Sequence, residues 1–251
     1  MSTHPLEHAA QRRHHDTHHN PALSRALHIA LGAYVVLAAL GIATLAFMVH
    51  ASPYLPVDLA LTREIQSIHE PWFAWLMWNV NWLGFGIEAT SLVALTVLVT
   101  YLAGWRWAAV VGALDAATIW AINIIIGWIV ARPYPVPGPE FNGMLVDLTR
   151  PSFPGGHASS FIAFYGFMWF LVFTRVQKPW PRLPLLLFFG ALLVLVVPSR
   201  VYMGRHWPTD TLAAVLLGTI WLILSILLYQ WGKVQPWVRR HFADRQALWQ
   251  R

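Results

Sequence analysis

The chain has 251 residues, of which 57% are apolar and only 11% are charged, and its mean hydropathy is +0.51. Soluble proteins average about 25% charged residues, so this composition excludes an ordinary soluble domain and favours an integral membrane protein. Because the chain contains no cysteine, disulfide scaffolds, Cys-ligated metal centres and cysteine nucleophiles are excluded as well.

The N-terminal residues 1–28 are polar and rich in histidine, and they precede the first apolar run at 29–50. This composition is typical of a disordered tail, which can bind metal ions adventitiously without a catalytic role. The polar lead and the apolar run are both too long for a cleaved signal peptide. We therefore expect residues 29–50 to form a retained transmembrane helix.

Six apolar runs are long enough to cross about 30 Å of hydrocarbon at about 1.5 Å per residue. The predicted class is therefore an all-α, polytopic membrane protein with six transmembrane helices. The predicted spans are 29–50, 86–103, 106–131, 157–176, 183–199 and 211–231.

The segment between the first two spans, 51–85, is amphipathic and contains the Trp-rich sequence PWFAWLMWNVNWLG. Tryptophan favours the membrane–water interface, so we expect this segment to lie in or near the outer interface. A seventh span through 71–85 is the less favoured alternative, because it would reverse the charge asymmetry of every later loop.

The positions of the lysines and arginines predict the orientation, because cations in short loops stay cytoplasmic far more often than they are translocated. With the N-terminus inside, 12 of the 17 cations are cytoplasmic, so the charge of +6 indicates membrane topology rather than nucleic-acid binding. The predicted organisation is a cytoplasmic tail at 1–28, a six-helix membrane domain at 29–232 and a basic cytoplasmic tail at 233–251. The five cations that fall on the outer side are Arg63, Arg132, Arg150, Arg200 and Arg205.

Three short polar segments meet the outer ends of the predicted spans: ARPYP, RPSFPGGHASS and SRVYMGRHWPTD. Pro133 ends the third span immediately after Arg132, because proline has no amide donor. Gly155 and Gly156 permit a tight turn before His157, where free amides at a helix start suit an oxyanion.

These residue types together favour phosphate chemistry. Guanidinium groups and helix-start amides stabilise the charge on phosphoryl oxygens. One histidine can attack phosphorus while a second, protonated histidine delivers a proton to the leaving oxygen. Asp210 follows His206 by four residues, so its carboxylate is within reach of one ring nitrogen if the sixth span begins there. Each residue alone has a structural explanation, such as an interfacial arginine or a helix cap, but their convergence favours a site.

The three segments resemble the signature motifs of the type 2 phosphatidic acid phosphatase superfamily, whose integral membrane members have six helices. The strongest match is the third motif, met by Ser199, Arg200, His206 and Asp210. The resemblance implies that His206 is the nucleophile, Asp210 its partner and His157 the proton donor. It implies phosphate ligands at Arg132 and Arg200, together with Gly155 and Gly156.

Two family positions differ in this chain. The second motif has Gly155 where serine is usual, and Ile125 stands where a lysine is expected seven residues before Arg132. Asn123 is rotated away from Arg132 on a continuous helix and is a poor substitute. Arg150 and Arg205 are the candidates to replace the missing charge.

The resemblance implies hydrolysis of a lipid phosphate or polyprenyl diphosphate through a phosphohistidine. The distribution of cations predicts that this site faces the extracytoplasmic side of the cell membrane. Undecaprenyl diphosphate, phosphatidic acid and phosphatidylglycerol phosphate are the leading substrates. The expected partners are the lipid substrate and the bilayer, with no nucleic acid, no cofactor and no metal, and the oligomeric state is open. The alternatives are a lipid phosphotransferase, a non-catalytic protein that binds or transports anionic lipids, and a haem-binding electron carrier.

Overall fold

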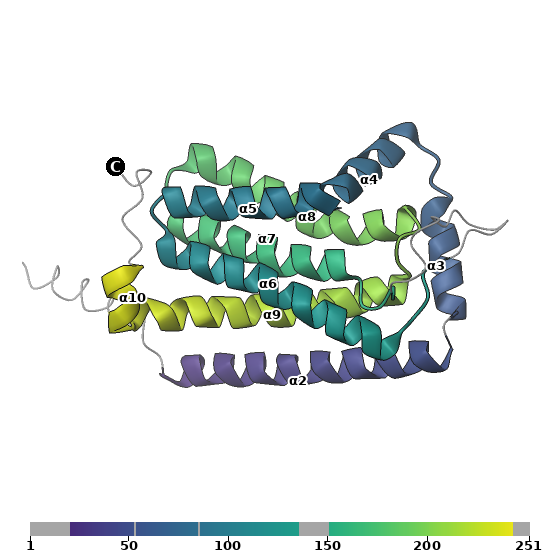
Figure 1. Ribbon diagram of the computed structural model, residues 1–251, viewed down its shortest axis with the longest axis horizontal. Helices are drawn as coiled ribbons and strands as arrows, with labels where there is room; N and C mark the ends of the chain where they lie inside the picture. Colours follow the sequence, from purple (N-terminus) through teal and green to yellow (C-terminus); the bar gives the residue numbers. More distant parts are fainter. Residues whose placement is uncertain (1–20, 53, 85, 136–150, 243–251) are drawn as a thin grey trace, which may run out of the picture.

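The computed structural model describes residues 21–52, 54–84, 86–135 and 151–242, and within these ranges the only regular secondary structure is helical. The predicted all-α class is confirmed. The helices are α2 (Pro21–Ala51), α3 (Pro56–Gln66), α4 (Pro71–Leu83), α5 (Gly86–Leu102), α6 (Arg106–Val130), α7 (Gly156–Arg175), α8 (Pro179–Tyr202), α9 (Pro208–Val234) and α10 (Pro236–His241). Figure 1 shows the long helices side by side, with α3 lying across one end.

Among the described residues, five helices are long and apolar enough to cross a membrane, namely α2, α6, α7, α8 and α9. The short helices α4 and α5, bent by 68° relative to each other, pass the same test when they are taken together. The multi-pass architecture is therefore confirmed, with five or six candidate spans. Three helices are longer than predicted, because hydropathy detects only the apolar part of a helix. Helix α9 spans Pro208–Val234 rather than 211–231. Helix α2 begins at Pro21 rather than 29, and α8 ends at Tyr202 rather than 199, so Arg200 is helical.

Helix α7 lies at the centre of the bundle, and its buried residues include Phe161, Phe164 and Phe167. It packs closely on α9 at Gly218, where an added Cβ would lie 2.7 Å from the carbonyl oxygen of Ser159. Glycine is therefore required for the two backbones to approach this closely. This contact places the start of α7 beside the start of α9, which are the two helix ends that bear His157 and Asp210.

The segment predicted to be interfacial folds as α3 and α4, neither of which crosses the bundle alone. With 13 residues, α4 extends only about 20 Å. One face of α4 exposes Trp72, Trp75, Trp78 and Trp82, whereas its buried residues are Met77, Val80 and Asn81. Helix α3 buries Asp58, Thr62 and Gln66, and the Gln66 amide donates to carbonyls at the end of α8. Helix α3 therefore attaches to the bundle through polar side chains, whereas α4 buries two apolar side chains and Asn81.

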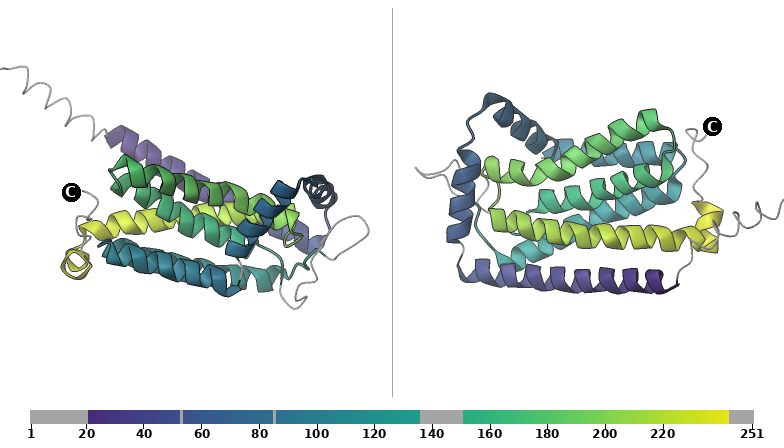
Figure 2. Two further views of the ribbon diagram at one scale, coloured as in Figure 1. Left: turned by 90° about the horizontal axis from the view of Figure 1, so that it is seen from above. Right: turned by 180° about the vertical axis from the view of Figure 1, so that it is seen from behind.

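The two ends of the bundle differ in charge. At the end where α2 begins and α9 finishes, the described cations are Arg25, Arg106, Arg175, Lys178, Arg182, Lys233, Arg239 and Arg240. At the opposite end, covered by α3, they are Arg63, Arg132, Arg200 and Arg205. Figure 2 shows that α10 and the start of α2 lie together at the first of these ends. The His-rich residues 1–20, Arg150 and residues 243–251 lie outside the described ranges.

Candidate active site

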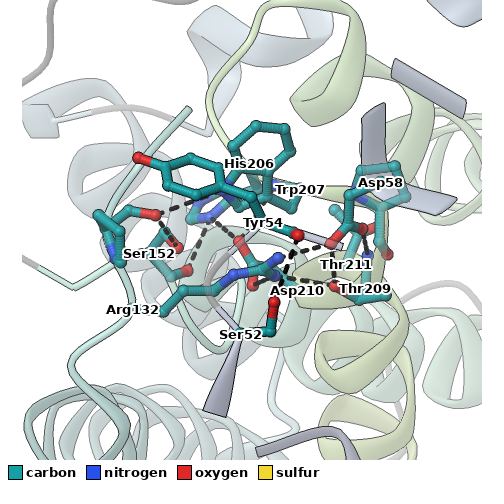
Figure 3. Close-up of polar contacts among 12 residues, drawn as sticks. Ser52, Tyr54, Asp58, Arg132, Ser152, His206, Trp207, Thr209, Asp210 and Thr211 are labelled. Carbon is teal, nitrogen blue, oxygen red and sulfur yellow. Dashed lines mark hydrogen bonds and ion pairs between the residues drawn. The ribbon is translucent and has the colours of Figure 1, made fainter. Parts of the chain in front are cut away.

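The three polar segments identified in the sequence meet at the end of the bundle covered by α3 (Figure 3). Arg132 follows the end of α6, His157 opens α7, Arg200 lies in the last turn of α8, and Asp210 lies in the first turn of α9. The ring centroids of His157 and His206 are 6.4 Å apart. The structure therefore brings together every predicted site residue that it describes.

A left-handed turn after α8 positions His206. Gly204 has a φ of +61°, a conformation that favours glycine, and its amide donates to the carbonyl of Val201. The amides of Arg205 and His206 then both donate to the carbonyl of Arg200, at 2.9 and 3.3 Å. This turn fixes Arg205 and His206 directly above the end of α8.

The main-chain carbonyl of Ser152 determines the tautomer of His206. It lies 2.9 Å from Nδ1 of His206, so Nδ1 carries the proton and donates it, and Nε2 is left as the basic nitrogen. Ser152 is itself fixed, because its amide donates to the carbonyl of Arg132 and its hydroxyl donates to that of Pro133. Asp210 Oδ2 is farther from Nδ1, at 4.0 Å. Asp210 thus acts on the ring as a nearby charge, whereas Ser152 orients it.

Burial lowers the pKa of His206 to about 3, and the charge of Arg200 is the next largest cause. Arg205 and Arg132 lower this pKa further, whereas the hydrogen bond to Ser152 raises it. The imidazole is therefore neutral at pH 7, as a nucleophile must be.

This pKa predicts a specific loss of stability in acid. Between pH 6.5 and about 3 the unfolded state binds a proton at His206 that the folded state does not, so this residue destabilises the fold as pH falls. By pH 5 the loss is about 2 kcal/mol. We expect the melting temperature of the wild type to fall relative to that of His206→Gln by a few degrees between pH 7.5 and 5. An unchanged difference would contradict the lowered pKa.

The start of α7 follows an irregular segment that packs on α9. The Gly155 amide donates to the carbonyl of Asp210 at 3.1 Å, and a Cβ on Gly155 would lie 3.4 Å from the same oxygen. Neither Gly155 nor Gly156 has a positive φ. Gly155 therefore packs against α9 and Gly156 against Asn123 of α6, without a left-handed backbone at either residue. The first-turn amides that follow have no intrahelical partner, as at any helix start.

Arg132 lies in a fully buried ion-pair network. Its NH1 donates to Asp210 Oδ1 at 2.5 Å, and its NH2 donates to Asp58 Oδ2, also at 2.5 Å. Thr209 bridges the network by accepting a hydrogen bond from Arg132 and donating one to Asp58. The other oxygen of Asp210 accepts the Trp207 amide at the start of α9. Both terminal nitrogens of the guanidinium thus contact carboxylates of the protein.

Arg200 and Arg205 provide the remaining positive charge. Arg200 is 2% exposed, and its NH1 donates to Oδ1 of Asn81 on α4 at 2.5 Å. Its Nε is buried and has no hydrogen-bond partner in the described structure. Burial is also the main cause that lowers the pKa of Arg205. Both guanidinium groups lie close enough to His206 for their charges to lower its pKa.

The structure also shows where two side chains of α6 lie: Ile125, which replaces the family lysine, and Asn123, which was expected to face away from Arg132. Ile125 is 53% exposed, so the side chain at this position points away from the site. Asn123, expected to face away, instead accepts a hydrogen bond from Ser159 of α7 at 3.0 Å, and a Cβ on Gly156 would lie 3.7 Å from it. The wheel argument was wrong because α6 ends at Val130 and Ala131 is left-handed, so Arg132 is not on the helix.

Four contributors to the site were not predicted from the sequence: Asp58, Asn81, Thr209 and the carbonyl of Ser152.

Asp115, an acidic residue within α6, accepts a hydrogen bond from Ser225 of α9 at 2.6 Å. Within the described ranges, no group of three or more His, Asp, Glu or Cys side chains could hold a metal ion.

Comparison with known proteins gives one family. Residues 107–233 match the PAP2 superfamily. YbjG of Escherichia coli (strain K12), named for undecaprenyl-diphosphatase activity, is 28% identical over 135 residues, covering 49% of this chain and 63% of that protein. Phosphatidylglycerophosphatase B of Bacillus subtilis (strain 168) is 25% identical over 181 residues, covering 72% of this chain and 87% of that protein.

A solved structure supports the same fold. The crystal structure of the transmembrane PAP2-type phosphatidylglycerolphosphate phosphatase from Bacillus subtilis matches with a TM-score of 0.66 and 24% identity, covering 80% of this chain and 98% of that one. Since the family match spans half of the chain and includes all three motif segments, the protein belongs to the PAP2 superfamily. The family and the names of its relatives support a membrane lipid phosphatase.

Proposed function

We propose that the protein is a membrane phosphatase that hydrolyses a lipid phosphate or polyprenyl diphosphate through a phosphohistidine at the extracytoplasmic face. The observation that carries the proposal is the hydrogen bond from Nδ1 of His206 to the Ser152 carbonyl. It leaves Nε2 unprotonated among the charges of Arg200 and Arg205, with His157 nearby.

In the first step, Nε2 of His206 attacks phosphorus while the bond from phosphorus to the lipid oxygen breaks. His157 donates a proton to that leaving oxygen. Arg200, Arg205 and the first-turn amides of α7 hold the phosphoryl oxygens, and Asp210 stabilises the positive charge that develops on the His206 ring. In the second step, water attacks phosphorus, His157 takes its proton, and the phosphorus–nitrogen bond breaks to release phosphate.

Arg132 has a different role in this proposal from the direct phosphate ligand suggested by the resemblance. Its NH1 and NH2 contact Asp210 and Asp58, so Arg132 fixes the carboxylate beside His206. Arg205 is the described candidate for the charge of the missing family lysine.

The names of the relatives support two substrate classes, undecaprenyl diphosphate and phosphatidylglycerol phosphate. The direct test is phosphate release by the purified protein from undecaprenyl diphosphate, phosphatidylglycerol phosphate and phosphatidic acid, with and without chelator. We expect release from at least one lipid, unaffected by chelator. No release from any lipid would contradict the hydrolase assignment, and transfer of phosphate to a second lipid without release would favour the phosphotransferase.

The extracytoplasmic placement of the site rests on the charge difference between the two ends of the bundle. The cysteine-free chain allows single-cysteine labelling without a prior background variant. His69→Cys lies in the exposed turn between α3 and α4 at the site end, and Gln177→Cys is exposed between α7 and α8 at the other end. We expect a membrane-impermeant maleimide to label His69→Cys in intact cells and Gln177→Cys only after permeabilisation. The reverse pattern would contradict this orientation.

A further inference from the structure

The most unexpected feature of the site is the buried carboxylate of Asp58, which comes from α3. Asp58 lies outside residues 107–233, the part of the chain that matches the family, so the family motifs do not include it. Its side chain is fully buried, and it pairs with the fully buried Arg132. Burying a carboxylate is costly unless it is paired and hydrogen-bonded. The buried position of Asp58 therefore requires an explanation.

Within the described part of the chain, the side-chain hydrogen bonds of Asp58 go to Thr209 of α9 and to Arg132, which also contacts Asp210. Oδ1 accepts the Thr209 amide at 2.8 Å, and Oδ2 accepts the Thr209 hydroxyl at 2.8 Å. Oδ2 also accepts NH2 of Arg132, whose NH1 contacts Asp210. Asp58 therefore acts as a helix cap for α9 from a distant part of the chain, and it shares the charge of Arg132 with Asp210.

This sharing determines how much negative charge remains beside the nucleophile. When both carboxylates are ionised, the single arginine leaves the network a net charge of −1, and Asp210 Oδ2 lies 4.0 Å from Nδ1 of His206. Without the charge of Asp58, Arg132 would neutralise Asp210 alone. The attraction between Asp210 and the positive charge that develops on His206 would then be weaker.

We propose that Asp58 is a positioning residue for the nucleophile, acting through Arg132 and Asp210 without contacting the substrate. This inference rests on the proposed function. It places α3 among the functional elements of the protein, as the helix that divides the charge of Arg132 between two carboxylates.

The test is Asp58→Asn, which keeps an oxygen for the Thr209 amide and removes the charge. We expect the single-turnover rate constant at saturating lipid to fall by about tenfold or more. A tenfold fall corresponds to weakening the stabilisation of the charged His206 ring by the free energy of one pKa unit. KM should stay within about threefold, because Asp58 contacts neither Arg200 nor Arg205. Partial unfolding lowers the amount of active protein but not the rate constant of the molecules that remain folded. A role of Asp58 in folding alone would therefore leave the rate constant unchanged. The control is Asp115→Asn, a buried aspartate in the middle of α6.

Two further measurements keep the proposal testable if Asp58→Asn folds poorly. Thr209→Val removes the hydroxyl that bridges Arg132 and Asp58, and we expect it to lower the same rate constant by about threefold or more. In a double-mutant cycle, Asp58→Asn should have little further effect in an Arg132→Gln background, because Asp58 acts through Arg132.

Wild-type rate constants in Asp58→Asn, or in Thr209→Val if Asp58→Asn fails to fold, would overturn the proposal, as would additive effects in the cycle. An inactive wild type would instead refute the proposed function.

Discussion

His206→Gln is expected to lower kcat by about four orders of magnitude or more, to the background rate, because no other group in the site occupies the position of the nucleophile. Glutamine retains an amide donor for the carbonyl of Ser152, so the local hydrogen bond and the fold should survive. The measurement is phosphate release from the lipid that the wild type hydrolyses fastest.

The matched control is His69→Gln, which changes an exposed histidine between α3 and α4 at the same end of the molecule. It should retain wild-type turnover. Substantial turnover by His206→Gln would contradict the assignment of the nucleophile.

Arg200→Lys is expected to lower kcat/KM by about 100-fold. Lysine keeps the charge but loses the planar fork that contacts Asn81 through NH1, and removal of one preorganised donor typically costs about 10²–10³ in rate. Asn81→Ala removes the hydrogen-bond partner of NH1 while leaving the guanidinium, and we expect it to cost about tenfold.

Arg182→Lys is the matched control for Arg200→Lys. Arg182 lies at the other end of α8 and donates to the carbonyl of Phe173. Its replacement should leave kcat/KM unchanged. Equal losses in the two variants would show that arginine content, and not the position of Arg200, determines activity.

Much of this site could be predicted from the sequence, because its chemistry is concentrated in short segments beside helix ends. Hydropathy locates those ends, and the rarity of charge in an apolar chain draws attention to Arg132, Arg200 and Arg205. His157 and His206 follow from the same logic, since each is next to glycine or arginine at a helix boundary. These residues meet at one end of the bundle because successive spanning helices run antiparallel to each other.

The contributors that could not be predicted act over long sequence separations or through the main chain. Asp58 lies in the sequence PVDLALTREIQ, which mixes apolar, polar and charged residues as an amphipathic surface helix does, and only tertiary packing buries it against Thr209. The same holds for Asn81 and its contact with Arg200. Ser152 acts on His206 through its carbonyl, which every residue possesses, so no side-chain signature exists.

The helical-wheel argument about Asn123 failed for a local reason. It assumed a continuous helix to Arg132, whereas the left-handed Ala131 ends α6 one residue earlier and redirects the arginine toward α3 and α9. Periodicity predicts the face of a residue only within the helix, and one non-helical residue removes the relation.

The central claim is that His206 becomes covalently phosphorylated. The most direct test is to mix the purified wild type with a lipid radiolabelled in the hydrolysed phosphate, stop the reaction within one turnover, and measure protein-bound label. The account predicts label that is stable in alkali and lost in acid, as for a phosphorus–nitrogen bond, and its absence from His206→Gln. Equal labelling of the wild type and His206→Gln would contradict this claim. So would efficient phosphate release by a wild type that carries no protein-bound label at any quench time.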